Sequence, residues 1–168
     1  MQYKLLILDV DGVMTDGTKT YDLAGNCISK SFADLDFTAI KLLKQMGVNV
    51  CWLSGDHVFN KGIAESRQID FFGSTVDDCI NKLAVLPGIL AHYGVTIDQT
   101  VYAGDDIFDL PIMRAIVAGG GAACKPINAS PLLLDEPGVY NVPVIGGHGV
   151  VSRIFTKYWK WDGKIPCH

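Results

Sequence analysis

The sequence lacks several features that would assign it directly to a class of protein. No apolar stretch reaches 18 residues without a polar interruption, and no signal-peptide pattern precedes the first strand, so we expect neither a membrane span nor secretion. Lysine and arginine form no run and the net charge is −4, which argues against nucleic acid, because neutralising several phosphates requires clustered basic residues. These absences predict a cytoplasmic protein.

Cysteine and histidine show no ligand spacing. The five cysteines are odd in number and widely spaced and include no Cys-x-x-Cys pair, so neither a disulfide framework nor a zinc site follows. We interpret Cys51, inside an apolar strand pattern, as a small core residue. The four histidines share no metal-binding spacing. These residues are Cys27, Cys51, Cys79, Cys124, Cys167, His57, His92, His148 and His168.

Strand and helix patterns alternate along the chain, which is typical of an α/β fold with a doubly wound, Rossmann-like parallel sheet. Residues 17–32 depart from this alternation and predict a β-hairpin that turns at Gly25 and Asn26. With 168 residues, 49% of them hydrophobic, we expect one domain, 1–168, with this hairpin in place of a cap domain. We predict strands near 4–9, 48–53, 71–72 and 100–103, helices near 36–46, 57–67, 79–93 and 109–116, and either a strand or a loop at 118–124.

The most informative segment begins at residue 5, where four apolar residues run into Asp9, Val10, Asp11 and Gly12. Such a run is typical of a buried parallel strand, and these sheets bind ligands beyond the carboxyl ends of their strands. Residues i and i+2 point to the same side, so both carboxylates can face one pocket. Two charges about 4 Å apart repel by about 4 kcal/mol at an effective dielectric of about 20, so they favour a cation such as Mg²⁺. A pair of solvated turn aspartates is the alternative.

Three further segments carry polar residues where strands end or helices start. Ser54 and Gly55 follow an apolar strand pattern, and a hydroxyl beside exposed backbone N–H groups can bind phosphate. Lys82 stands early in an amphipathic run, where a solvated position is the common alternative. A third strand pattern ends in an acidic loop with Asp105, Asp106 and Asp109. The order Asp-x-Asp, Ser-Gly, Lys and Gly-Asp-Asp is far more specific than any of its parts.

Together these segments resemble the haloacid dehalogenase superfamily of phosphohydrolases over nearly the whole chain. Within it, the sequence is most similar to the small phosphatases of sugar-acid phosphates, the 3-deoxy-D-manno-octulosonate 8-phosphate phosphatase subfamily. The first two of the matching segments are the strongest signals. The segments are Asp9 to Gly17 (DVDGVMTDG), Gly104 to Pro111 (GDDIFDLP), Ser130 to Leu134 (SPLLL) and Gly146 to Gly149 (GGHG).

The resemblance implies a phosphoryl-transfer site that acts on a small phosphorylated sugar. Asp9 would be the nucleophile that takes the phosphoryl group as an aspartyl-phosphate. Asp11 would protonate the departing sugar oxygen and then activate the water that hydrolyses the intermediate. Ser54, Gly55 and Lys82 would bind the phosphate oxygens, so that catalysis is mostly positioning and charge stabilisation.

The resemblance also implies a Mg²⁺ ion. Asp105 would hold it together with Asp9 and the backbone carbonyl of Asp11. Asp106 and Asp109 would either coordinate the metal themselves or support the residues that do. The metal would neutralise charge where the anionic substrate meets the anionic nucleophile.

The predicted hairpin is too short to seal a pocket by itself. In the resembling subfamily such hairpins meet across subunits in a tetramer, so we expect a homotetramer, with a solvated hairpin on a monomer as the alternative. The tail from Tyr158 to Trp161 is rich in aromatic residues, and we expect it to be buried against the same chain or another subunit.

Three departures from the subfamily concern substrate binding and not catalysis. Leu35, Asp56 and His148 stand where the sugar-acid phosphatases usually carry arginine. Arginine binds carboxylates in a bidentate manner, and the loss of one charge-assisted hydrogen bond costs about 1.5–3 kcal/mol. A neutral or differently charged sugar phosphate is therefore a better candidate substrate than an eight- or nine-carbon keto acid. His148 is either a loop residue or a ligand for a substrate hydroxyl or phosphate.

Two other functions remain open. The missing arginines favour a non-catalytic module for oligomerisation or regulation. The intact acidic positions oppose it, because a protein without catalysis would have no physical reason to keep carboxylates that repel one another. A phosphoacceptor domain of the response-regulator kind also places an aspartyl-phosphate in a doubly wound sheet. Its acidic residues would be spaced differently, and Asp11 would have no role there.

Overall fold

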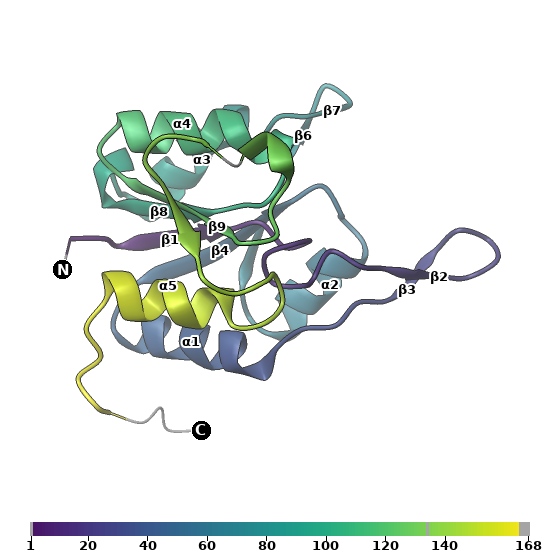
Figure 1. The fold of residues 1–168 in the computed structure, drawn as a ribbon, viewed down its shortest axis with the longest axis horizontal. Helices are drawn as coiled ribbons and strands as arrows, with labels where there is room; N and C mark the ends of the chain where they lie inside the picture. Colours follow the sequence, from purple (N-terminus) through teal and green to yellow (C-terminus); the bar gives the residue numbers. More distant parts are fainter. Residues whose placement is uncertain (1, 134, 165–168) are drawn as a thin grey trace.

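In the computed structural model, which describes residues 2–133 and 135–164, six parallel strands form the central sheet (Figure 1). Cys167, His168 and Leu134 lie outside the described residues. The strand order is β10-β9-β8-β1-β4-β5, and all neighbouring pairs run parallel. The strands are β1 (Leu5–Leu8), β4 (Asn49–Ser54), β5 (Asp70–Gly73), β8 (Thr100–Ala103), β9 (Ala122–Pro126) and β10 (Val139–Val142).

The helices cover both faces of the sheet, which confirms the doubly wound α/β fold (Figure 1). Among the described residues, no helix is long and apolar enough to cross a membrane. The helices are α1 (Asp34–Gln45), α2 (Phe59–Ser66), α3 (Lys82–Tyr93), α4 (Leu110–Ala118) and α5 (Val150–Tyr158), with short 3₁₀ turns at Ile97–Gln99, Ile107–Asp109 and Pro131–Leu133.

The alternation of side chains along β1 divides the core into two halves. Leu6 and Leu8 pack with residues of α1 and α5 on one face, whereas Leu5 and Ile7 pack with residues of α3 and α4 on the other. All four side chains are fully buried. A strand covered on both faces needs a continuous apolar sequence, which explains why β1 could be recognised as a short apolar run.

One predicted helix begins later than expected. The helix expected over 79–93 starts at Lys82, because Cys79 and Ile80 pair back onto Thr75–Val76 as a second small hairpin, β6 (Thr75–Val76) and β7 (Cys79–Ile80). Its turn residues, Asp77 and Asp78, both have positive φ, 49° and 61°. Aspartate tolerates this left-handed conformation, which the turn of a tight hairpin requires.

Besides β6 and β7, the sequence left β9 open and did not predict β10 or α5. The glycine-rich stretch 118–124 contains the end of α4, a turn, and the start of β9. Strand β10 and helix α5 follow it, and neither was predicted. The remaining strands and helices lie within a few residues of their predicted positions, which is the usual uncertainty at element ends.

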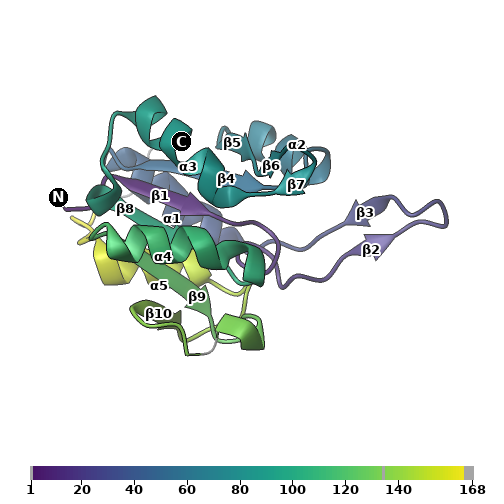
Figure 2. The ribbon, with the colours of Figure 1, turned by 90° about the horizontal axis from the view of Figure 1, so that it is seen from above.

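The predicted hairpin between 17 and 32 is formed by β2 (Thr20–Tyr21) and β3 (Cys27–Ser29), which pair antiparallel. It extends away from the sheet as a narrow arm (Figure 2). Tyr21, Leu23 and Ile28 on this arm are exposed. The arm leaves the sheet directly after the loop that carries Asp11, so its two ends return to the edge where the strands finish.

The aromatic residues of the tail differ in how far they are buried. Trp159 is buried, and its indole N–H donates a hydrogen bond of 3.0 Å to the backbone carbonyl of Tyr3. The ring of Tyr3 also contacts the rings of Tyr158 and Trp159 edge-on. Trp161 is about half exposed, at 47%. The tail is therefore buried against its own chain at Trp159, as expected, whereas Trp161 remains partly exposed and donates its indole N–H to the carbonyl of Lys164 at 2.9 Å.

Candidate active site

The carboxyl ends of β1, β4 and β8 lie next to one another, and a cleft of about 730 Å³ opens at this edge of the sheet. Parallel sheets place their ligand-binding loops at this edge. The structure brings all the sequence-predicted site residues together there. The residues that line the cleft include Asp9, Asp11, Ser54, Gly55, Lys82, Asp105, Asp106 and Asp109.

Three carboxylates form a compact cluster at the base of the cleft. Oxygen atoms of Asp9, Asp105 and Asp109 all lie within 4.8 Å of one another. Such a cluster of hard oxygen ligands suits Mg²⁺, which prefers carboxylates, carbonyls and water. Asp105 belongs to the loop after β8 and Asp9 to the loop after β1, so the pairing of these two strands sets the distance between them.

The carboxylate of Asp105 is the open member of this cluster. Within the described part of the chain, no donor is hydrogen-bonded to its side chain. Burial raises the pKa of Asp105 to about 8, and the charges of Asp9 and Asp109 add to the effect. Burial likewise raises the pKa of Asp9 to about 7, against the opposing effect of Lys82. A cation between Asp9 and Asp105 would offset this cost, so the donor set fits a divalent metal.

Asp109 has a different environment from Asp9 and Asp105, because its oxygens are already occupied. One oxygen contacts Lys82 Nζ at 2.6 Å and accepts the hydroxyl of Tyr102. The other accepts the backbone N–H groups of Asp105 (2.9 Å) and Asp106 (3.0 Å). This fully buried carboxylate therefore fixes the acidic loop and Lys82.

Lys82 contacts both Asp9, the candidate nucleophile, and Asp109. It is the first residue of α3 and is 5% exposed, and Asn81 caps the helix by accepting the N–H of Ala84 at 3.1 Å. Its ammonium group lies 2.9 Å from Asp9 and 2.6 Å from Asp109. The two carboxylates raise the pKa of Lys82 despite its burial, which keeps it cationic. The solvated-face interpretation of Lys82 is therefore wrong.

Ser54 is set up as a hydrogen-bond donor. Its Oγ accepts the Asn60 side-chain amide at 3.0 Å and the Asp56 backbone N–H at 3.2 Å. With two donors already on its oxygen, the hydroxyl proton is left to point at another acceptor. Gly55 beside it is exposed and lines the cleft, so a backbone N–H and a hydroxyl lie together where an anion could bind.

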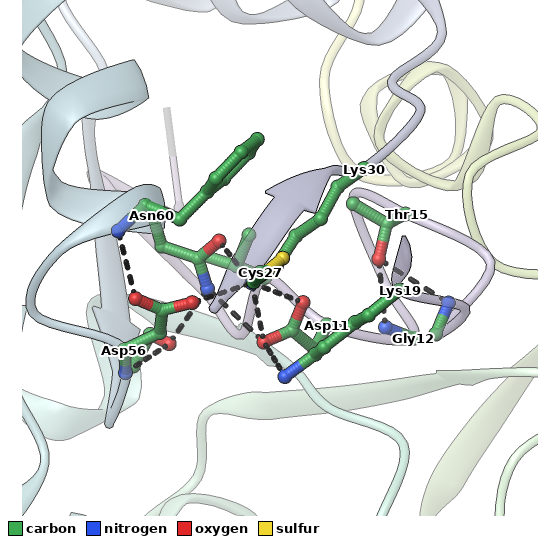
Figure 3. Close-up of polar contacts among 12 residues, drawn as sticks. Asp11, Gly12, Thr15, Lys19, Cys27, Lys30, Asp56 and Asn60 are labelled. Carbon is green, nitrogen blue, oxygen red and sulfur yellow. Dashed lines mark hydrogen bonds and ion pairs between the residues drawn. The ribbon is translucent and has the colours of Figure 1, made fainter. Parts of the chain in front are cut away.

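Asp11 is held by residues that sequence analysis missed (Figure 3). Lys30 contacts its two oxygens at 2.9 and 3.1 Å, Lys19 contacts it at 3.1 Å, and the amide of Asn60 donates to it at 3.1 Å. Lys19 and Lys30 stand at opposite ends of the hairpin arm, and Asn60 lies on α2. No local pattern marks these residues, since they are 8 to 49 positions from Asp11 in sequence.

The supporting residues of the acidic loop have local roles. Asp106 is exposed and accepts the backbone N–H of Ile107 at 2.7 Å, at the start of a 3₁₀ turn. The GGHG segment packs against the catalytic loop, because a Cβ on Gly146 would lie 1.9 Å from the carbonyl oxygen of Gly12. The GGHG segment thus meets the segment that begins at Asp9.

The three positions that depart from the sugar-acid phosphatases occupy different places. Asp56 lines the cleft, and its carboxylate contacts Lys30 at 2.7 Å and accepts the N–H of Phe59 at 2.8 Å. Leu35 and His148 are exposed and lie outside the cleft lining of this chain. The His148 ring is 2.9 Å from the carbonyl of Gly146, within its own loop, which agrees with the interpretation as a loop residue.

The chain is similar in sequence to known phosphatases. No protein-family model matches the chain. A 3-deoxy-D-manno-octulosonate 8-phosphate phosphatase from Haemophilus influenzae is 36% identical over 127 residues, which cover 74% of this chain and 67% of that protein. The phosphatase of the same name from Escherichia coli K12 is 28% identical over 169 residues, covering 96% of this chain and 82% of that protein.

Solved structures agree with these sequence relatives. The cobalt-bound deoxy-D-mannose-octulosonate 8-phosphate phosphatase of Haemophilus influenzae has a TM-score of 0.80 and 30% identity over 93% of this chain and 86% of that one. The phosphatase from Moraxella catarrhalis, in complex with a magnesium ion, a phosphate ion and a KDO molecule, has a TM-score of 0.75 and 25% identity over 92% of this chain and 84% of that one.

Proposed function

This chain belongs to the 3-deoxy-D-manno-octulosonate 8-phosphate phosphatase family of the haloacid dehalogenase superfamily and is a phosphatase, and we propose that it hydrolyses a small sugar phosphate through an aspartyl-phosphate on Asp9. The observation that carries the proposal is the position of Asp9, a buried carboxylate between the ammonium group of Lys82 and the open carboxylate of Asp105. The ammonium group can attract an anionic phosphate, and Asp105 could hold a cation that does the same.

In the first half of the proposed reaction, the Asp9 carboxylate attacks the substrate phosphorus. The bond from phosphorus to the sugar oxygen breaks, and that oxygen receives a proton from Asp11. The hydroxyl of Ser54, the backbone N–H of Gly55 and the ammonium group of Lys82 would bind the non-bridging phosphate oxygens. Charge stabilisation by fixed donors of this kind is a major source of catalysis in phosphoryl transfer.

In the second half, a water molecule attacks the phosphorus of the aspartyl-phosphate. The bond between phosphorus and the Asp9 oxygen breaks, its electron pair returns to the carboxylate, and the water proton passes to Asp11. Asp11 projects into the same cleft as Asp9, so a single side chain can serve both halves. Inorganic phosphate leaves, and the free carboxylate is regenerated.

We propose Mg²⁺ as the metal. Asp9, Asp105 and the backbone carbonyl of Asp11 would hold it, with Asp109 orienting the loop through the N–H groups of Asp105 and Asp106. When bound, the ion would neutralise negative charge as phosphate approaches the nucleophile. Solved relatives with magnesium and with cobalt support a divalent cation at such a site.

The charges in the cleft favour a leaving group without a carboxylate. Lys19 and Lys30 are already paired with Asp11 and Asp56. A carboxylate on the sugar would meet two acidic side chains there and would have to displace one of these pairs. Hydroxyl groups, in contrast, could donate to the same carboxylates. We therefore propose a neutral sugar phosphate in preference to a keto-acid phosphate.

We also propose that the protein is a cytoplasmic homotetramer, as the family resemblance implies. The exposed apolar side chains of the hairpin arm, Tyr21, Leu23 and Ile28, support an interface on that arm. Size measurement in solution tests this expectation, because a variant with Leu23→Lys and Ile28→Lys should dissociate if the arm forms the contact. A wild-type monomer would contradict it.

The proposed function is tested by phosphate release from a panel of phosphate esters. The panel holds neutral sugar phosphates and octulosonate and nonulosonate phosphates, each measured with Mg²⁺ and with EDTA. We expect metal-dependent release, with neutral esters as the better substrates. Release from the octulosonate ester alone would overturn the proposed substrate class but keep the phosphatase, whereas the absence of release from every ester by folded protein would overturn the function.

A further inference from the structure

Lys30 is the least expected residue near the reaction centre. It comes from the returning end of the hairpin arm, yet its side chain is fully buried, at 0% exposure. Its ammonium group contacts Asp11 at 2.9 Å, Asp56 at 2.7 Å and the side-chain oxygen of Asn60 at 2.7 Å (Figure 3). An ammonium group has three protons, so these three partners use its full donor capacity.

The partners of Lys30 are polar residues of the site, and none is part of the apolar core. Asp56 is fixed in turn, because its second oxygen accepts the backbone N–H groups of Val58 (3.1 Å) and Phe59 (2.8 Å) where α2 begins. A buried ion pair is weak evidence for a contribution to stability, since desolvation opposes the attraction between the charges. The observed geometry has a clearer consequence for orientation, because Lys30 ties Asp11 to the rigid start of α2.

Asn60 extends this arrangement to the phosphate-binding side. Its amide nitrogen donates to Asp11 at 3.1 Å and to Ser54 at 3.0 Å, while its oxygen accepts Lys30. Asn60 is fully buried. Because its oxygen faces the ammonium group, its nitrogen must face Asp11 and Ser54, so Lys30 also fixes which way this amide points.

We propose that Lys30, held by Asp56 and Asn60, is a positioning residue that fixes Asp11 for proton transfer in the second half of the reaction. The inference rests on the proposed function. In that half, water forms a bond to phosphorus, the bond to the Asp9 oxygen breaks with its electron pair, and the water proton goes to the Asp11 carboxylate. The contacts from Lys19 and Lys30 hold the Asp11 carboxylate in place within the cleft, where it can accept this proton.

An aryl ester separates the two halves of the reaction. The p-nitrophenolate leaving group of p-nitrophenyl phosphate departs without a proton, so formation of the aspartyl-phosphate from this ester does not need Asp11. Hydrolysis of the intermediate still does. The protein is therefore mixed rapidly with p-nitrophenyl phosphate and Mg²⁺. The initial phase of nitrophenol release gives the rate of the first half of the reaction. When hydrolysis of the intermediate is slow, the steady phase gives the rate of the second half.

We expect Lys30→Met to slow the steady phase at least about tenfold while the initial phase stays within about twofold of wild type. The aspartyl-phosphate should accumulate, as it should in Asp11→Asn, which serves as the reference for a lost proton acceptor. Lys61→Met is the matched control, because Lys61 is the neighbour of Asn60 on α2 and, among residues 2–133 and 135–164, forms an ion pair only with exposed Glu65, at 3.9 Å. Its two phases should equal those of wild type.

A second variant covers the case in which Lys30→Met fails to fold. Asp56→Asn removes one of the negative charges that hold Lys30 and hardly changes the volume of the side chain. The contact between Lys30 and Asp11 remains. This variant should slow the steady phase selectively but less than Lys30→Met. Equal losses in both phases, or unchanged kinetics in folded Lys30→Met, would overturn the positioning role while wild-type turnover leaves the phosphatase intact. A wild type without turnover would instead overturn the proposed function and this inference with it.

Discussion

The carboxylate of Asp105 occupies the space that a side chain on Gly12 would fill. A Cβ built on Gly12 would lie 1.8 Å from Asp105 Oδ2, and the backbone of Gly12 has a φ of +85°. Glycine is therefore required at this position for two reasons: the backbone is left-handed, and the acidic loop approaches closely. The contact brings the loop after β8 against the loop after β1, where Asp9 and Asp11 stand.

Gly12→Ala should abolish metal-dependent turnover, because the added methyl group pushes Asp105 away from Asp9. Gly25→Ala in the hairpin arm is the matched control, since Gly25 also has a positive φ, +83°, but a Cβ there would meet no atom within 4 Å. The control carries only the backbone strain, about 1–2 kcal/mol. Equal activity of the two variants in a phosphatase assay would contradict the steric argument.

The raised pKa values of Asp9 and Asp105 predict how Mg²⁺ acts on stability. Both carboxyls have an ordinary pKa of 3.8, which the fold raises to about 7 and about 8. The folded protein therefore binds more protons than the unfolded chain in this interval, and without metal its stability falls as pH rises from about 4 to about 8.

Mg²⁺ should consequently raise the melting temperature more at pH 8 than at pH 5, because protons compete with the metal for the two carboxylates at low pH. Thermal unfolding at both pH values, with and without Mg²⁺, measures this effect. Asp105→Asn should lose most of the Mg²⁺-dependent shift. A shift of equal size in that variant would place the metal elsewhere.

Asp11→Asn should discriminate between leaving groups. Sugar oxygens need a proton on departure and aryl oxygens do not, so kcat/KM for a sugar phosphate should fall about 100-fold or more, and that for p-nitrophenyl phosphate much less. Steady-state kinetics with the two esters gives the ratio. Equal losses on both esters would show that Asp11 serves only to hold the metal loop.

Asp36 should be important for stability and not for chemistry. Its buried carboxylate accepts the N–H groups of Gly149 (3.1 Å) and Ser152 (3.0 Å), so a residue of α1 caps the start of α5. Asp36→Ala leaves these groups unpaired and should lower the free energy of unfolding by about 1–3 kcal/mol. Asp34→Ala, at an exposed position on the same helix, should change it far less in urea unfolding.

The fold could be predicted where the sequence carried a local signal. Continuous apolar runs identified β1, β4 and β8, because strands covered on both faces need them. The hairpin of β6 and β7 was missed because each of its strands has only two residues. The helix predicted near 79–93 includes Cys79 and Ile80 of this hairpin, whereas the Asn81 cap marks the true start of α3.

The residues of the site could likewise be predicted only where the local sequence marks them. Asp9, Asp11 and Asp105 directly follow apolar strands, and the carboxyl ends of parallel strands meet at one edge of the sheet. Lys30 and Asn60 could not be found in this way, because their contacts with Asp11 span 19 and 49 residues and depend on the path of the hairpin arm. Asp56, noted only as a missing arginine, instead neutralises Lys30.

The most direct test of the account compares phosphate release by wild type and by Asp9→Asn on the best ester of the panel, with Mg²⁺ present. Asparagine keeps the size of the side chain but cannot form an acyl phosphate, so we predict a loss of at least about 10³-fold with the fold retained by circular dichroism. Substantial turnover by folded Asp9→Asn would contradict the aspartyl-phosphate mechanism.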